Sequence, residues 1–131
     1  MATNQNLKNV TKISLNDEMK TLTEPYKPKK LAVLNERAWV ELALHKGPFP
    51  YGNHYHETDD ELFICVKGTV TIELGDDSVK LVEGEMLHVK AGQIHMPNAE
   101  DDCYLIRLKT SKHMDAVLDD GTVISNKKKN N

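Results

Sequence analysis

Cysteine is scarce in this sequence of 131 residues, which contains two, Cys65 and Cys103, neither of them in a CxxC pair. Two cysteines without such spacing do not make the framework of a disulfide-stabilised secreted domain. We therefore expect both thiols to lie in strands as small hydrophobic residues, rather than to react or to bind metal.

Long hydrophobic runs are also absent. No apolar run approaches the roughly 18 residues that a membrane span requires. The polar opening MATNQNLKN lacks the apolar segment of a signal peptide. We therefore expect a soluble, cytoplasmic protein with no membrane partner.

No sign of charge dominates the chain. It carries 17 Lys and Arg residues and 20 Asp and Glu residues, for a formal net charge of -3, and they are spread along the sequence. Domains that bind nucleic acid usually carry a basic face, so we expect no nucleic-acid partner. The KKK run at 127–129 lies in a terminal NKKKNN and is better explained as a solvated tail.

The length suits one domain with a single hydrophobic core. The segment SLNDEMKTL, at 14–22, begins with capping and acidic residues and is followed by Pro25 and Pro28. This pattern predicts a short helix that ends before the prolines. We expect 1–30 to form an N-terminal arm with that helix, 31–110 a barrel, and 111–131 a partly disordered C-terminal extension.

From residue 31 onward the hydrophobic pattern is that of strands. Turn residues, such as those of LGDDS at 74–78, separate short alternating runs, among them AWVELALH, ELFICV, TVTIEL, EMLHV and CYLIRL. Many short strands with frequent turns are typical of antiparallel sandwiches and barrels. The sequence therefore predicts an all-β fold.

The stretch HYHETDDELFICVKG, at 54–68, contains the residues with the clearest chemistry. Successive residues of a strand point to opposite faces, so His54 and His56 project together while Tyr55 points away. Two imidazoles on one face of a strand suit a metal ion.

Two later residues can complete a metal site. Glu61 begins the next alternating run and can turn toward the histidines, and His95 follows a turn at Gly92 that can return it across the barrel. Each residue alone is an ordinary surface or loop residue, but the combination favours metal binding. Three imidazoles and one carboxylate suit one divalent transition metal per chain, namely manganese, iron, nickel or zinc, whereas calcium and magnesium prefer more oxygen ligands.

These residues resemble the first motif of the cupins, small jelly-roll metalloproteins. The motif G-x5-HxH-x3,4-E-x6-G matches from His54 through Glu61 to Gly68, with Gly47 one residue too early for the leading glycine. The second cupin motif, G-x5-PxG-x2-H-x3-N, is matched less completely. It fits at Gly84, Gly92 and His95, with Lys90 and Ala99 in place of its proline and asparagine.

The resemblance covers about residues 31–109 and has two implications. The first is a double-stranded β-helix, or jelly-roll, barrel. The second is a metal held by the residues at the four family ligand positions, which are His54, His56, Glu61 and His95. The stretch GPFPYGNHYHETDDELFICVKG is further similar to short single-domain cupins labelled mannose-6-phosphate isomerase-like, a label that reflects shared fold more than activity.

Three other residues could line the pocket, and each has an ordinary alternative. His88 could relay a proton if its strand face is inside, although a satisfied strand histidine is the commoner case. Arg107 could clamp a carboxylate or phosphate or lie outward on the rim. Tyr51 could reach the mouth or pack within its PFPYG loop.

The strand AWVELALH leaves its orientation open. Glu41 and His45 share a face with Trp39 and Ala43, and the alternation alone does not say which face is inside.

The combined pattern favours a metal-dependent enzyme acting on a small oxygenated metabolite, such as a sugar, keto acid or enediol, of the isomerase or dioxygenase type. Glu61 could serve as its base, as in some cupins. The alternative is a non-catalytic module that holds a small molecule or a metal. Jelly-roll edges and outward apolar residues such as Leu62 and Ile64 also predict a homodimer.

Overall fold

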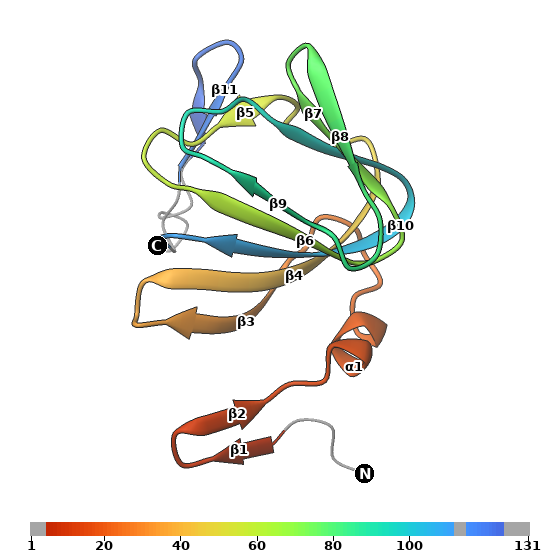
Figure 1. Cartoon of the computed structure of the whole chain (residues 1–131), viewed down its shortest axis with the longest axis vertical. Coiled ribbons are helices and arrows are strands. Elements are labelled where there is room, and N and C mark those ends of the chain that lie inside the picture. The colour runs from red at the N-terminus through yellow and green to blue at the C-terminus, as the bar shows by residue number, and fades with distance from the viewer. Residues whose placement is uncertain (1–4, 112–114, 125–131) are drawn as a thin grey trace.

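The computed structural model describes residues 5–111 and 115–124 (Figure 1). Its elements in chain order are β1 (Gln5–Leu7), β2 (Val10–Lys12), α1 (Leu15–Lys20), β3 (Lys29–Leu34), β4 (Ala38–Gly47), β5 (His54–Tyr55), β6 (Glu61–Lys67), β7 (Val70–Leu74), β8 (Asp77–Leu81), β9 (Met86–Val89), β10 (Met96–Lys109), β11 (Ala116–Leu118) and β12 (Val123–Ile124).

Antiparallel strands fold into a barrel, which confirms the predicted all-β jelly roll (Figure 1). One sheet has the order β3-β4-β10-β6-β9. A register shift between Ala99 and Cys103 lets the first part of the long strand β10 pair with β7 while its second part pairs with β4 and β6. Strand β10 thereby joins the two sides of the barrel.

The barrel interior is filled by the alternate residues of β6 and their neighbours. Phe63, Cys65 and Leu105 are fully buried, and the remaining buried members of this core are Val70, Ile72, Leu81, Val89, Ala99 and Cys103. The two thiols lie 3.9 Å apart and are free. The prediction that both cysteines are small hydrophobic residues inside strands is confirmed.

The predicted short helix forms as α1. The Ser14 hydroxyl accepts a hydrogen bond from the backbone N–H of Asp17 at 3.3 Å and caps the first turn. Met19 packs with Leu42 and Leu44 in a second cluster outside the barrel. No helix within the described part of the chain is long and apolar enough to cross a membrane.

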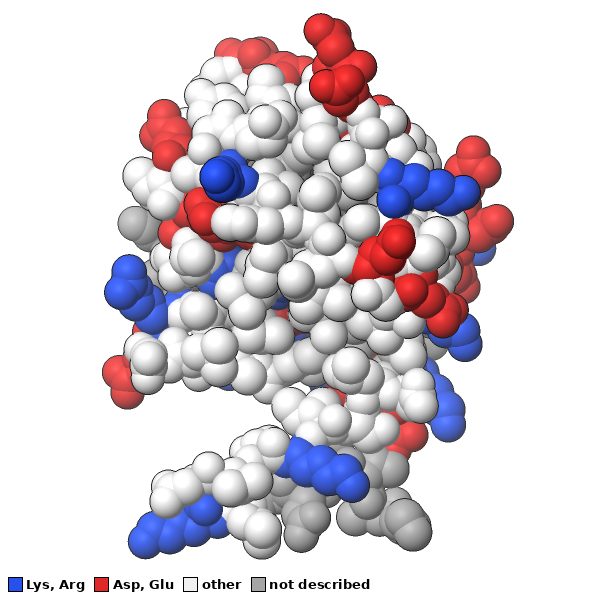
Figure 2. Space-filling view, viewed as in Figure 1, with Lys and Arg blue, Asp and Glu red and all other residues white. Residues whose placement is uncertain are grey.

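Both ends of the chain contain structure that the sequence did not predict. The arm at 1–30 includes the hairpin β1–β2, which stands apart from the barrel (Figure 1). Residues 115–124, expected as an extension, form β11 and β12, and β11 pairs with β5 beside the histidines. Residues 112–114 and 125–131 of the extension, which was expected to be partly disordered over 111–131, lie outside the described residues, and so does the basic run. Acidic and basic side chains are interspersed on the face shown in Figure 2.

Candidate metal centre

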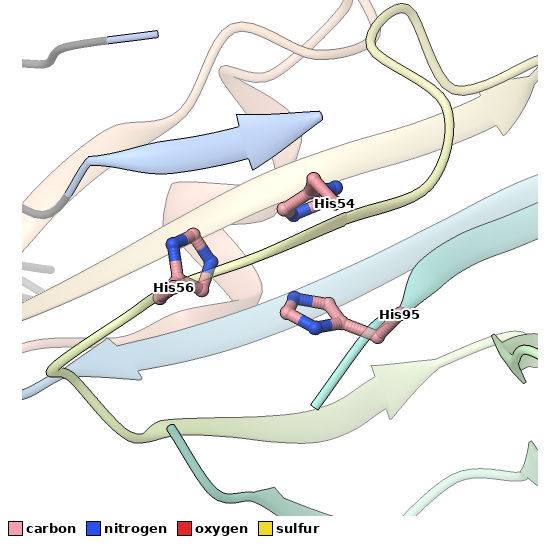
Figure 3. Close-up of side chains that lie close together, drawn as sticks. All are labelled: His54, His56 and His95. Carbon is pink, nitrogen blue, oxygen red and sulfur yellow. The ribbon is translucent and has the colours of Figure 1, made fainter. Parts of the chain in front are cut away.

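The fold brings three histidines from two sequence motifs together, as predicted (Figure 3). His54 and His95 are joined by two backbone hydrogen bonds, in which the N–H of His54 donates to the carbonyl of His95 at 3.1 Å and the reverse bond measures 2.8 Å. The N–H of Gly92 donates to the carbonyl of His56 at 2.7 Å. The turn at Gly92 therefore returns His95 across the barrel to the HxH segment.

One ring nitrogen from each of these histidines lies within 4.8 Å of the others, and all three side chains are buried. In Figure 3 the rings of His54, His56 and His95 surround a common space. Three imidazoles gathered this closely could hold one metal ion.

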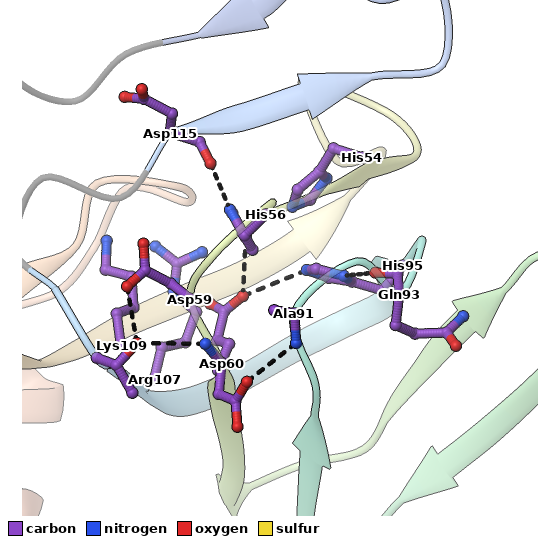
Figure 4. Close-up of polar contacts among 12 residues, drawn as sticks. His54, His56, Asp59, Asp60, Ala91, Gln93, His95, Arg107, Lys109 and Asp115 are labelled. Carbon is purple, nitrogen blue, oxygen red and sulfur yellow. Dashed lines mark hydrogen bonds and ion pairs between the residues drawn. The ribbon is translucent and has the colours of Figure 1, made fainter.

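Each imidazole is oriented by a backbone carbonyl, and Figure 4 shows this contact for His56 and for His95. The Nδ1 atom of His54 lies 3.0 Å from the carbonyl oxygen of Gly52, that of His56 2.9 Å from Asp115, and that of His95 2.9 Å from Gln93. A carbonyl oxygen only accepts, so Nδ1 carries the proton in all three rings. In the neutral rings the lone pair therefore lies on Nε2, the tautomer that a metal ligand requires.

Glu61 completes the cluster at the start of β6. Its Oε1 atom lies 3.2 Å from Nε2 of His56 and 3.2 Å from Nε2 of His95, yet Nε2 of His95 has no properly aligned hydrogen-bond partner among the described residues. An Nε2 lone pair and a carboxylate oxygen repel each other unless a proton or a metal ion lies between them, and one metal ion can bind all of these donors at once. The donor set therefore fits a bound metal ion.

The charge states of two of these groups suit metal binding. Burial, and next the neighbouring His95, lower the pKa of His54 to about 4, so this ring is neutral near pH 7. Burial opposes ionisation of Glu61, but the imidazoles of His56 and His95 and the guanidinium of Arg107 hold its pKa well below the ordinary value. A neutral imidazole and an ionised carboxylate are the forms that bind metal.

A cavity of about 420 Å³ opens beside the histidines. His54, His56 and Glu61 form one part of its wall, and Ala116 and Ile124 of the C-terminal strands form another. A volume of this size accommodates a small molecule. The cluster is thus open to a ligand.

Strand β4 presents its Glu41 face to this cavity, which settles the orientation that the sequence left open. Glu41 and His45 are both buried and line the cavity, together with Trp39 and Ala43. Burial, and next the nearby Arg107, lower the pKa of His45 to about 3, so this ring is also neutral near pH 7.

The three other candidate residues lie in different places relative to the cavity. Arg107 points inward and lines the cavity, and Tyr51 lies at its edge, 54% exposed and packed edge-on against Phe49. His88 is absent from the cavity lining found among the described residues. It is exposed on β9, and its Nε2 lies 2.7 Å from Oδ2 of Asp60. A proton relay by His88 in the cavity is therefore not supported.

Lys109 is a cavity residue that the sequence interpretation missed. It extends the alternation of Leu105 and Arg107 along β10, so the same inward face includes it. The period-two pattern could have identified it. Its long aliphatic chain and its position at the strand end made a surface location the ordinary expectation.

Comparisons with known proteins agree with this fold. The cupin domain family profile (Cupin_2) matches residues 40–106, just over half of the chain. A cupin-2 domain containing protein from Shewanella frigidimarina is 29% identical, with a TM-score of 0.69 over 73% of this chain and 91% of that one. A protein from Neisseria meningitidis is 25% identical, with a TM-score of 0.67 over 76% and 98% of the two chains.

A more distant structure, KdgF from a Halomonas species, is 20% identical, with a TM-score of 0.57 over 64% of this chain and 76% of that one. At this identity the likeness concerns the fold alone. None of the curated proteins compared with this chain matches it. The family match, the antiparallel barrel and the histidine cluster agree, and the chain belongs to the cupin domain family.

Proposed function

We propose that this protein is a metal-dependent enzyme acting on a small oxygenated metabolite, such as a sugar, keto acid or enediol. One divalent transition metal, manganese, iron, nickel or zinc, would be held by His54, His56 and His95, with Glu61 as the fourth ligand. The observation that carries the proposal is the set of three imidazoles whose Nδ1 atoms are all held by backbone carbonyls beside a cavity.

A bound divalent ion would supply Lewis-acid polarisation of ligand oxygens. The protein's own residues orient the ligand and manage its protons. Glu61 is ionised and can accept a proton at Oε2, the oxygen directed away from the imidazoles and 4.0 Å from Nε of Arg107. Ala116 and Ile124 line one side of the cavity with apolar surface.

The donor set favours a ligand-binding site over a structural one. Structural zinc sites are usually closed by thiolates, but Cys65 and Cys103 lie in the barrel core. Three imidazoles and a carboxylate leave coordination positions for a ligand. The finer resemblance to mannose-6-phosphate isomerase-like cupins, the isomerase or dioxygenase reaction type, the homodimer and the cytoplasmic location stay predictions.

The metal part of the proposal is tested by elemental analysis of protein purified without a metal-affinity tag. We expect about one transition metal ion per chain in the wild type. The variant His56→Ala should lose it, because one ligand is removed, and Tyr55→Ala is the matched control from the opposite strand face. If both variants keep the metal, the proposed site is wrong.

The enzymatic part is tested by incubating metal-loaded and chelator-treated protein with sugars, keto acids and enediols. Proton NMR would follow isomerisation or cleavage, and an oxygen electrode would follow dioxygen uptake. Turnover by the metal-loaded form alone supports the proposal. Saturable binding without turnover of any compound would instead favour the non-catalytic binding module.

A further inference from the structure

Four charged side chains lie together on the inner face of the sheet. Strand pairing places Glu41 of β4 opposite Arg107 of β10, and Lys109 of β10 opposite Glu61 of β6. Glu41, Glu61 and Lys109 are buried, and the Arg107 side chain is 17% exposed. Burying charges is costly unless each is paired, so two cations in a cavity wall require an explanation.

Glu41 holds both cations in place. Its Oε2 accepts a hydrogen bond from Nη2 of Arg107, and its Oε1 lies 3.4 Å from Nζ of Lys109. The indole Nε1–H of Trp39 also donates to Oε1, at 2.9 Å. One carboxylate thus positions two cationic side chains and fixes where they point.

The charge of Arg107 is also offset by Glu61, the carboxylate of the proposed metal site. Nε of Arg107 is buried with no hydrogen-bond partner in the described part of the chain, and Oε2 of Glu61 lies 4.0 Å from it. In Figure 4, Arg107 and Lys109 lie on one side of the polar cluster and His54 and His95 on the other. Arg107 and Lys109 line the same cavity as His54 and His56.

The charges of this cavity balance only without a metal. Glu41 and Glu61 offset Arg107 and Lys109, and imidazole ligands are neutral. A bound divalent ion adds two positive charges and engages Glu61, which leaves the cationic pair with Glu41 alone. A ligand with one carboxylate offsets one of these two added charges, whereas a neutral sugar offsets neither.

We propose that the cavity binds a small 2-hydroxy or 2-oxo carboxylate, with its carboxylate on Arg107 and Lys109 and its second oxygen toward the three histidines. A planar guanidinium suits a carboxylate, and the cavity of about 420 Å³ accepts a molecule of this size. The inference rests on the proposed function, because the excess positive charge comes from the metal ion.

The chain contains its own reporter for this test. Trp39 is its single tryptophan and lies in the cavity wall against Glu41, so tryptophan fluorescence responds to a ligand there. Zinc-loaded protein is titrated with glycolate, lactate and pyruvate, and with their neutral amides. We expect a saturable change with the acids and affinities at least roughly tenfold weaker for the amides.

Three variants, one of them a control, test whether the ligand carboxylate binds at Arg107 and Lys109. Lys109→Met should weaken binding of the acids by about tenfold or more without changing the amides, and Lys109→Arg should restore it because it keeps the charge. Lys80→Met, on the exposed face of β8, is the control and should bind like the wild type. Thermal unfolding checks that each variant is folded.

Zinc content is measured first, so that the two proposals fail separately. Protein that binds no zinc contradicts the proposed function. Zinc-loaded protein that binds acids and amides equally, binds no acid, or prefers inorganic phosphate to every acid overturns the carboxylate inference alone. An unchanged acid affinity in Lys109→Met overturns it as well.

Discussion

Replacing Glu41 with glutamine removes the charge that holds Arg107 and Lys109 while keeping the shape of the side chain. Buried Lys109 and half-buried Arg107 then lack their shared counter-ion, and the other carboxylate, that of Glu61, is 4.0 Å from the guanidinium. Breaking a buried ion pair costs about 3–5 kcal/mol. The lower end applies here, because glutamine can still accept from Trp39 and because burial lowers the pKa of Lys109, which helps it to release its proton.

We therefore expect Glu41→Gln to lose about 3 kcal/mol of unfolding free energy and roughly 10 °C of melting temperature. Urea denaturation of chelator-treated protein at pH 7 measures this loss without a contribution from bound metal. Asp102→Asn is the control, because its pair with Lys46 spans 3.6 Å with both side chains more than half exposed. It should cost less than about 0.5 kcal/mol. Equal losses in the two variants would refute the reasoning.

Two further predictions concern the close backbone contact at Gly68 and the buried imidazole of His45. Gly68 has φ +88°, and a Cβ there would lie 2.4 Å from the carbonyl oxygen of Asp102, whereas Gly75 has φ +82° and open space around it. Gly68→Ala should therefore cost roughly 3 kcal/mol or more and Gly75→Ala about 1 kcal/mol in urea denaturation; similar losses would contradict the clash. His45 has a pKa of about 3 in the folded protein, so the unfolded chain binds the extra proton, and stability should fall as pH falls below about 6.5. Between pH 6.5 and pH 5 the variant His45→Gln should lose roughly 1.5 kcal/mol less unfolding free energy than the wild type. The same pH dependence in both proteins would show that the ring is not neutral in the folded protein.

The strands could be predicted from local spacing, and the candidate metal ligands from that spacing together with the resemblance to the two cupin motifs. The period-two pattern of β6 separates buried from half-buried residues, and the same pattern places His54 and His56 on one side. The turn at Gly92 predicts the return of His95, which the backbone pairing of His54 and His95 confirms. The strand pattern and the turn are each encoded within a few neighbouring residues, and the fold then brings His95 to His54.

The remaining features depend on contacts between distant segments. The sequence pattern of β4 is compatible with either face inside, and pairing with β10 decides it. The Nδ1–H of His56 donates to the carbonyl of Asp115, 59 residues away, and a backbone acceptor leaves no side-chain signal. The alternation along β9 places His88 and Val89 on opposite faces but does not say which face is inside. Val89 is the buried one, so His88 faces out.

The measurement that tests the central claim most directly is X-ray absorption of the zinc-loaded wild-type protein at the zinc edge. Ligation by His54, His56 and His95 predicts a first shell of nitrogen and oxygen at about 2.0–2.1 Å with the outer-shell scattering of three imidazoles. A sulfur shell at about 2.3 Å, or an oxygen shell without imidazole scattering, would contradict the assignment of the metal to this histidine cluster.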